Sequence, residues 1–228
     1  MLAAGFLILA ALIPPGIVLA VIYGMDKIER EPPSLLVSLF LRGVLAMFPI
    51  LVLEIIGDSV ANVFSWSQLL YLFAAYFIVP GFIEEGVKYV VLIRRAWNEP
   101  NFNYTFDAVV YAVFVSLGFA AVENIMYVLD SGFSTAVVRA LFSIPGHAMF
   151  GVVMGSGVGR ARWLEVNGQI ERARTVRSHA WITAAVLHGL YDFLLVAFSG
   201  VFYIYFACLV IYVIRLLRKS AREDTRIC

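Results

Sequence analysis

The chain has 228 residues, of which 62% are hydrophobic, with a mean hydropathy of +0.89 and a formal net charge of +1. Soluble domains are only about half apolar, so a lipid bilayer is the expected solvent. The near-neutral charge and the lack of any long basic or acidic block argue against a nucleic-acid-binding protein.

Apolar segments long enough to cross a bilayer, which takes about 20 residues per helix, recur along the whole chain. In chain order the expected spans cover residues 2–23, 35–56, 69–93, 106–129, 135–158, 178–198 and 201–217. The first span lacks the basic residues that open a cleaved signal peptide, so we expect it to be retained. The sequence thus predicts an all-α, polytopic bundle of seven membrane helices, formed by a single integral membrane domain over residues 1–228.

Lysines and arginines alternate between the predicted loops. The first, third and fifth loops and the C-terminal tail carry them, whereas the second, fourth and sixth loops carry none. Because loops that face the cytoplasm are enriched in Lys and Arg, this pattern predicts seven crossings. The N-terminus is then outside and the C-terminus cytoplasmic.

The third span contains charged residues in the middle of an apolar run, Glu84, Glu85 and Lys88. A charge at mid-bilayer costs about 2.5–3.5 kcal/mol on insertion scales, so these side chains need partners within the protein. Helical spacing places Lys88 within reach of both Glu84 and Glu85. A purely structural ion pair is the alternative, but one lysine between two glutamates leaves excess negative charge.

Other spans supply further ionisable groups. His147 in the fifth and His188 in the sixth lie near the expected mid-bilayer depth, and Glu123 in the fourth and Asp192 in the sixth lie somewhat toward the outer face. His188 and Asp192 are four residues apart on one helix face. A carboxylate at that spacing can orient an imidazole ring and raise its basicity. An isolated pair of this kind is usually structural; its recurrence on several spans favours a functional site.

Proline–glycine pairs precede two of these groups, Pro80-Gly81 before Glu84 and Pro145-Gly146 before His147. A helix broken at membrane depth is tolerated where it lines a cavity or is buried in protein. We therefore expect one polar cavity to collect the side chains of Glu84, Glu85, Glu123, His147 and His188.

Two chemistries suit such a cluster, and we favour the first, with the metal as the open alternative. In one, Glu84 or Glu85 takes a proton from water, and a histidine polarises or protonates the group under attack. In the other, Glu123, His147 and His188 bind a metal, for which zinc is the natural candidate. The motifs H-E-x-x-H, G-x-S-G and G-x-G-D, which mark common zinc, serine and aspartyl intramembrane proteases, are absent.

Two remaining features favour structural roles. Gly151, Gly155 and Gly159 form a small-x-x-x-small ladder that predicts close approach of a neighbouring helix to the fifth span. Structural ion pairs or interface contacts, with no partners assigned, are expected for Arg42, Glu54, Asp107 and Arg139.

Four motifs occur in a fixed order on successive spans: Glu84-Glu85-x-x-Lys88, Phe119-x-x-x-Glu123, His147 and His188-x-x-x-Asp192. This order resembles the PrsW family of bacterial intramembrane proteases, which is related to CAAX prenyl proteases and bacteriocin-processing enzymes. The likeness extends over nearly the whole chain and includes Glu29, Glu31 and Pro32 in the first loop and the Ser116–Phe119 stretch.

The resemblance implies a multi-pass protease of the bacterial cytoplasmic membrane. Its implied substrate is a single-pass anti-sigma factor, cut first on the extracytoplasmic side so that later proteolysis frees a stress-response sigma factor. It implies a catalytic core of Glu84, Glu85 and His188, completed by Glu123, His147 and Asp192, with Lys88 as charge partner. It leaves the need for zinc open.

Other classes of protein also place ionisable groups in membrane helices. A proton- or ion-coupled transporter would use such groups and broken helices, although no inverted repeat is detectable. A haem protein with His147 and His188 as axial ligands would show a Soret band. A non-catalytic binding protein of the same superfamily would not need the complete motif set.

Overall fold

The computed structural model describes residues 2–63 and 67–227, and within these ranges it contains helices and no strand, apart from one isolated bridge between Tyr104 and Arg226. The helices in chain order are α1 (Leu2–Met25), α2 (Pro33–Val63), α3 (Gln68–Phe73), the π-helical turn η1 (Ala74–Ile78), α4 (Val79–Ala96), α5 (Asp107–Ser131), α6 (Phe133–Leu141), α7 (Ser143–Val166), α8 (Ile170–Ala197) and α9 (Ser199–Arg222).

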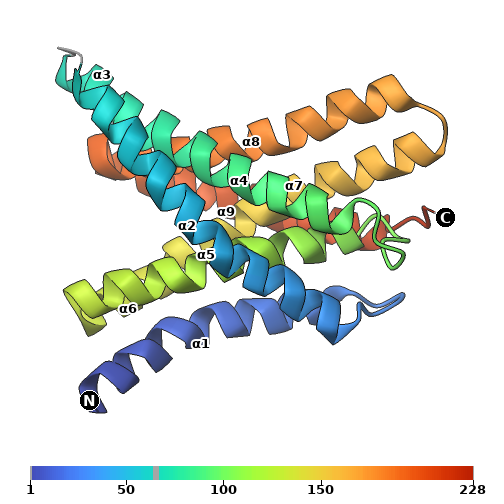
Figure 1. Cartoon of the computed structure of the whole chain (residues 1–228), viewed down its shortest axis with the longest axis horizontal. Coiled ribbons are helices and arrows are strands. Elements are labelled where there is room, and N and C mark those ends of the chain that lie inside the picture. The colour runs from blue at the N-terminus through green and yellow to red at the C-terminus, as the bar shows by residue number, and fades with distance from the viewer. Residues whose placement is uncertain (1, 64–66, 228) are drawn as a thin grey trace.

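Seven helical segments of the described chain are long and apolar enough to cross a membrane, which confirms the predicted all-α polytopic bundle. One crossing combines α3, η1 and α4, and another combines α6 and α7. Figure 1 shows the loops after α1, α4 and α7 at the same end as the C-terminus, whereas the start of α1 and the turns after α5 and α8 lie at the opposite end. The loops that carry lysine and arginine therefore share one end of the molecule.

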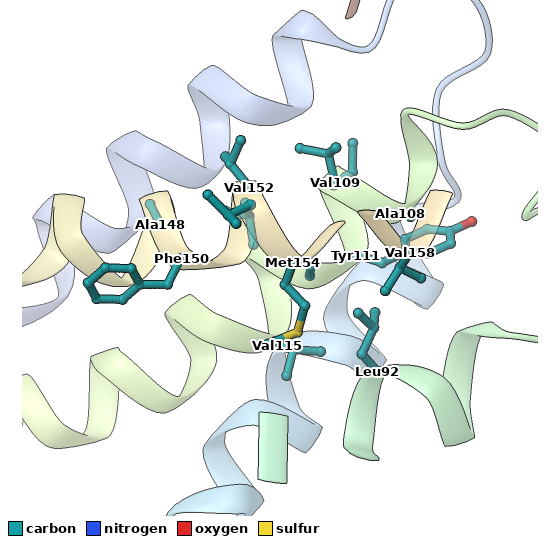
Figure 2. Close-up of a cluster of buried hydrophobic side chains, with 14 of the residues drawn as sticks. Leu92, Ala108, Val109, Tyr111, Val115, Ala148, Phe150, Val152, Met154 and Val158 are labelled. Atoms are coloured by element: carbon teal, nitrogen blue, oxygen red, sulfur yellow. The ribbon is translucent and has the colours of Figure 1, made fainter. Parts of the chain in front are cut away.

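Helix α5 is the centre of the bundle. In its most apolar stretch 72% of the residues are buried, compared with 17% for α1 and for α9. It packs against α7, α2 and α1. Figure 2 shows part of this core, in which side chains from α4, α5 and α7 interlock: Leu92, Val109, Tyr111, Val115, Phe150, Val152, Met154 and Val158. The α5–α7 contact therefore fixes the relative depth of the residues on these two helices.

The glycine ladder of α7 lies directly against the backbone of α5, which confirms the predicted close approach. A Cβ added at Gly155 would lie 2.5 Å from the carbonyl oxygen of Ala108, and one at Gly151 would lie 3.1 Å from the Cα of Val113. A Cβ at Gly159 would overlap the carbonyl oxygen of Thr105. Only glycine permits this separation of the two helices.

Similar contacts join the other helices around the centre. A Cβ at Gly118 of α5 would overlap a backbone oxygen of α2, and one at Gly81 of α4 would lie 2.7 Å from a backbone oxygen of α8. A Cβ at Gly157 of α7 would lie 2.5 Å from the Cβ of Ala180 in α8. Helices α2, α5, α7, α8 and α4 are therefore joined in sequence by contacts that leave no room for a methyl group.

We expect Gly155→Ala to lower the free energy of unfolding by about 1–3 kcal/mol, the usual cost of adding volume to a packed core. Thermal unfolding in detergent, followed by circular dichroism, measures the change. Gly16→Ala is the matched control, because a Cβ at that position of α1 would meet no atom within 4 Å. Equal melting temperatures for the two variants would contradict the close α5–α7 contact.

A helical irregularity precedes each proline–glycine pair, but only one of them is a break. The crossing that holds Pro80 stays helical, with the π-helical turn η1 directly before α4, whereas the fifth crossing divides at Phe142, so that Pro145 falls in the first turn of α7. The first turn of a helix tolerates proline because its N–H groups have no partner within the helix. The π-helical turn and the break at Phe142 each lie within about a turn of a proline–glycine pair.

Candidate active site

Three charged side chains of α4 form one buried ion cluster. Glu84, Glu85 and Lys88 are 4%, 0% and 1% exposed. Lys88 Nζ donates to Glu84 Oε2 at 2.8 Å and to Glu85 Oε1 at 2.9 Å. The same Nζ lies 4.2 Å from the ring centroid of Phe119 on α5, a cation–π contact. A single ammonium therefore serves both carboxylates, as the helical spacing predicts.

His147 of α7 connects Lys88 to Glu123 of α5. Its Nδ1 lies 3.4 Å from Lys88 Nζ, and its Nε2 lies 2.9 Å from Glu123 Oε2. Because an ammonium can only donate, Nδ1 accepts and Nε2–H donates to the carboxylate, so this network assigns a neutral ring with the proton on Nε2. The hydroxyl of Ser116 donates to the backbone carbonyl of His147 at 2.8 Å, which joins the two helices at this depth.

His188 of α8 closes the other side of the cluster. Its Nδ1 lies 3.0 Å from Glu85 Oε1, and its Nε2 lies 3.2 Å from Asp192 Oδ2. Carboxylates thus face both ring nitrogens, an arrangement in which an imidazolium donates twice. The ring of Phe150 stacks on His188 at 4.6 Å between centroids, with an interplanar angle of 17°. Stacking and two hydrogen bonds fix the orientation of the imidazole.

Arg139 of α6 belongs to the same network, although the sequence assigned it no partner. Its Nη2 lies 2.7 Å from Glu123 Oε2, and its Nε donates to Asn124 Oδ1 at 2.8 Å. Gly132, with a φ of +83°, forms the tight turn between α5 and α6 that brings the two helices together. The sequence did offer one signal for this pair: Arg139 lies within an apolar run, and a guanidinium at that depth needs a buried carboxylate as its partner. Glu54 of α2 is a further acid within electrostatic range of Glu84 and Glu123.

The structure brings together all the side chains that the sequence predicts to converge. The contacts form one continuous chain from α6 to α8, which passes through Arg139, Glu123, His147, Lys88, the adjacent Glu84 and Glu85, His188 and Asp192. These side chains contact one another directly. A cavity of about 670 Å³ lies elsewhere, among α7, α8 and α9 near the C-terminal end of α9, and none of these side chains lines it.

Four residues of this ion cluster could hold a metal ion. Glu84, Glu85, His147 and His188 each offer a ligand atom, and these atoms lie within 4.8 Å of one another. Two imidazoles with carboxylates are a typical zinc donor set. Glu85 Oε2 is also buried without a hydrogen-bond donor. The residues therefore fit a metal, provided that it takes the place of the Lys88 ammonium, which now contacts Glu84, Glu85 and His147.

This group differs from the metal ligands considered from the sequence. His147 and His188 are common to both, but Glu123 lies outside the converging group. The reason is that Glu123 Oε2 already contacts Arg139 and the Nε2 of His147. Glu123 is placed to orient His147, as carboxylates behind metal-binding histidines do.

Comparison with known proteins identifies the family. The family model described as PrsW family intramembrane metalloprotease matches residues 31–216. Protease PrsW of Bacillus subtilis (strain 168) is 35% identical over 204 residues, which cover 87% of each chain. Protease PrsW of Geobacillus kaustophilus (strain HTA426) is 35% identical over 193 residues, covering 84% of this chain and 81% of the relative.

A third relative, Protease PrsW of Clostridioides difficile (strain 630), is 34% identical over 194 residues, covering 83% of this chain and 79% of the relative. No solved structure gives a significant match. The family match includes every helix that contributes to the buried ion cluster. The chain therefore belongs to the PrsW family of intramembrane metalloproteases and is a multi-pass bacterial membrane protein.

Proposed function

We propose that this membrane peptidase makes the first, extracytoplasmic-side cut in a single-pass anti-sigma factor, after which further proteolysis releases a stress-response sigma factor. We also propose that residues 1–228 act as a single protease domain. The observation that carries the proposal is the buried cluster in which Glu84 and Glu85 share Lys88 while His188 contacts Glu85. Charges at membrane depth carry a large desolvation cost, so a cluster of them points to a functional site.

The side of the cut follows from the proposed topology. The loops rich in lysine and arginine share one end of the bundle, which the positive-inside rule places in the cytoplasm. The N-terminus is then outside. Glu123 lies in the last third of α5, and His188 lies in the last third of α8, and both helices run away from the basic loops. The cluster is therefore nearer to the extracytoplasmic surface.

The geometry suggests a role for each side chain in hydrolysis. Glu84 or Glu85 accepts a proton from the water that attacks the scissile carbonyl, while Lys88 keeps the other glutamate ionised. Asp192 holds the Nε2 of His188, so the Nδ1–H that now faces Glu85 is the group that donates a hydrogen bond to the developing oxyanion and a proton to the leaving amine. A metal held by His147, His188 and one glutamate would supply Lewis acidity to polarise the carbonyl and acidify water.

Reconstitution in liposomes tests the function. The full chain is combined with a candidate single-pass anti-sigma factor, and the products are identified by mass spectrometry. The proposal expects one initial cut on the extracytoplasmic side, absent in Glu84→Ala and Glu85→Ala. A first cut on the cytoplasmic side would overturn the proposed topology of cleavage, and cutting by both variants would overturn the proposed site.

Metal removal is expected to lower turnover at least about ten-fold, because the converging donor set fits a catalytic metal. Elemental analysis should find about one zinc per chain, absent from His147→Ala. Glu123→Ala should keep the metal with an affinity lowered about 10–100-fold, as expected of a residue that orients a ligand. Full turnover by metal-free protein would instead leave Glu84, Glu85 and His188 as the sole catalytic groups.

A further inference from the structure

A second group of buried acids lies at the opposite end of the bundle from the proposed active site. Asp26 follows α1, Glu31 lies in the loop before α2, and Asp107 is the first residue of α5. These three residues, here called the loop acid cluster, are 2%, 3% and 1% exposed. Each offers a carboxylate oxygen, and these oxygens lie within 4.8 Å of one another.

The loop acid cluster has fewer hydrogen-bond donors than acceptors. Asp107 Oδ2 accepts from the backbone N–H groups of Asn103 and Tyr104 at 3.0 and 2.7 Å, and Glu31 Oε2 accepts from the Tyr111 hydroxyl at 2.6 Å. In contrast, Asp107 Oδ1 and Asp26 Oδ2 are buried and have no donor. A buried acceptor without a donor is uncommon in native proteins and calls for a partner.

Positive charge is also lacking around these carboxylates. Within the described ranges, no ion pair to lysine or arginine involves Asp26, Glu31 or Asp107. Arg30 acts on Asp26 only through space, and its guanidinium lies 5.5 Å from the ring centroid of Tyr23. The contrast with the Glu84–Glu85–Lys88 group, where an ammonium contacts both carboxylates, is clear.

This environment makes the ionised cluster costly on its own. Burial, followed by repulsion from Asp224, raises the pKa of Asp26 to about 6. Burial, with repulsion from Asp26, raises the pKa of Glu31 to about 7. A bound cation would offset both effects, since it supplies the opposite charge and takes the place of the missing donors.

We propose that the loop acid cluster binds one hard divalent cation, Mg²⁺ or Ca²⁺. All the donors are oxygens, which these ions prefer, and no histidine or cysteine belongs to the described group. Asn103, whose backbone N–H donates to Asp107, also has a buried side-chain Oδ1 that lacks a donor. The ion is separate from the metal of the proposed active site in both position and donor chemistry.

The cation would hold two segments of the chain together at the end of the bundle that carries the basic loops. The first loop supplies Asp26 and Glu31, and the start of α5 supplies Asp107. The C-terminal tail joins the same region through Asp224, which accepts from Thr105 Oγ1 at 3.1 Å and from the Phe106 N–H at 2.8 Å.

Terbium luminescence tests the site in the purified full chain in detergent. Tb³⁺ replaces hard divalent ions, and Tyr111, whose hydroxyl contacts Glu31, would sensitise its emission. We expect one saturable site per chain, from which Mg²⁺ or Ca²⁺ displaces Tb³⁺; the more effective competitor identifies the ion. Glu31→Gln and Asp26→Asn should each weaken binding at least about ten-fold, because affinity depends on ligand charge.

Two variants separate this site from alternatives. Glu29→Gln removes an exposed carboxylate from the same loop and should leave the affinity within about two-fold. Glu85→Gln alters the proposed active site and should keep the Tb³⁺ signal. Glutamine and asparagine retain the acceptor oxygens for Tyr111 and for the Glu31 N–H, so both test variants should fold, and monodispersity by size exclusion checks this.

Three results would overturn the proposal. The first is the absence of a saturable signal from the wild-type chain, and the second is unchanged affinity in whichever of Glu31→Gln and Asp26→Asn is monodisperse. The third is loss of the signal in Glu85→Gln, which would place the ion in the other cluster. Failure of millimolar Mg²⁺ and Ca²⁺ to displace Tb³⁺ would also count against a divalent-cation site.

Discussion

Glu85→Gln is expected to lower the turnover of peptide cleavage by about 10²–10⁴-fold, the usual contribution of a general base, while substrate binding is retained. Glu85 is fully buried and lies 2.9 Å from Lys88 Nζ and 3.0 Å from His188 Nδ1. Glutamine preserves its volume but removes the charge, so Lys88 keeps only Glu84 as an ionised partner. Turnover in liposomes and binding of an uncleaved substrate peptide measure the two effects separately.

Glu84→Gln provides the comparison within the same ion cluster. Glu84 Oε2 is 2.8 Å from Lys88 Nζ but 3.9 Å from His188 Nδ1, so its loss disturbs His188 less. Asp58→Asn is the matched control, since it neutralises an exposed carboxylate of α2 that lies outside the network. If Glu84→Gln and Glu85→Gln both keep turnover within a few-fold of the wild type, neither glutamate is the base.

His188→Ala is expected to lower turnover by a similar factor, about 10²–10⁴-fold, because the imidazole is the only ring that contacts both Glu85 and Asp192 in the described site. Asp192→Asn should have a smaller effect, about 10–100-fold, since Asp192 acts by orienting the ring. The graded pair distinguishes a catalytic group from its positioning partner.

His179→Ala is the control for the histidine variants. His179 lies on the same helix as His188 but lines the cavity among α7, α8 and α9, away from the ion cluster. Its loss should leave turnover unchanged. Equal turnover for His188→Ala and His179→Ala would show that His188 takes no part in the chemistry, and an Asp192→Asn effect as large as that of His188→Ala would point to a direct role for Asp192.

Contacts within one helix could be predicted from the sequence, because helical geometry fixes them. The shared contacts of Lys88 with Glu84 and Glu85 and the His188–Asp192 pair follow from spacings of three and four residues. The number of membrane crossings could also be predicted from the sequence, since each crossing requires a long apolar run. These features depend on local chemistry alone.

Contacts between helices could not be predicted in the same way. The pairing of Arg139 with Glu123, and of His147 with Lys88, depends on which helix faces meet and at what depth. That alignment is determined by close backbone contacts such as the one at Gly155. The glycine pattern predicts a close contact there but does not indicate which helix makes it. The same limit applies to Asp107, which received no partner from the sequence but lies beside Asp26 and Glu31.

The glycine contacts between helices have a consequence for how a substrate reaches the buried charges. Helices α2, α5, α7, α8 and α4 are in backbone-to-backbone register, so sliding any one of them would break contacts along the whole series. The groups on these helices are thus preorganised, and solvent reorganisation during the reaction is small. We therefore expect the mobility needed to admit a peptide in the outer helices α1 and α9, whose apolar stretches are only 17% buried. Amide hydrogen exchange tests this expectation: backbone amides of α2, α4, α5, α7 and α8 should exchange slowly, and those of α1 and α9 should exchange faster.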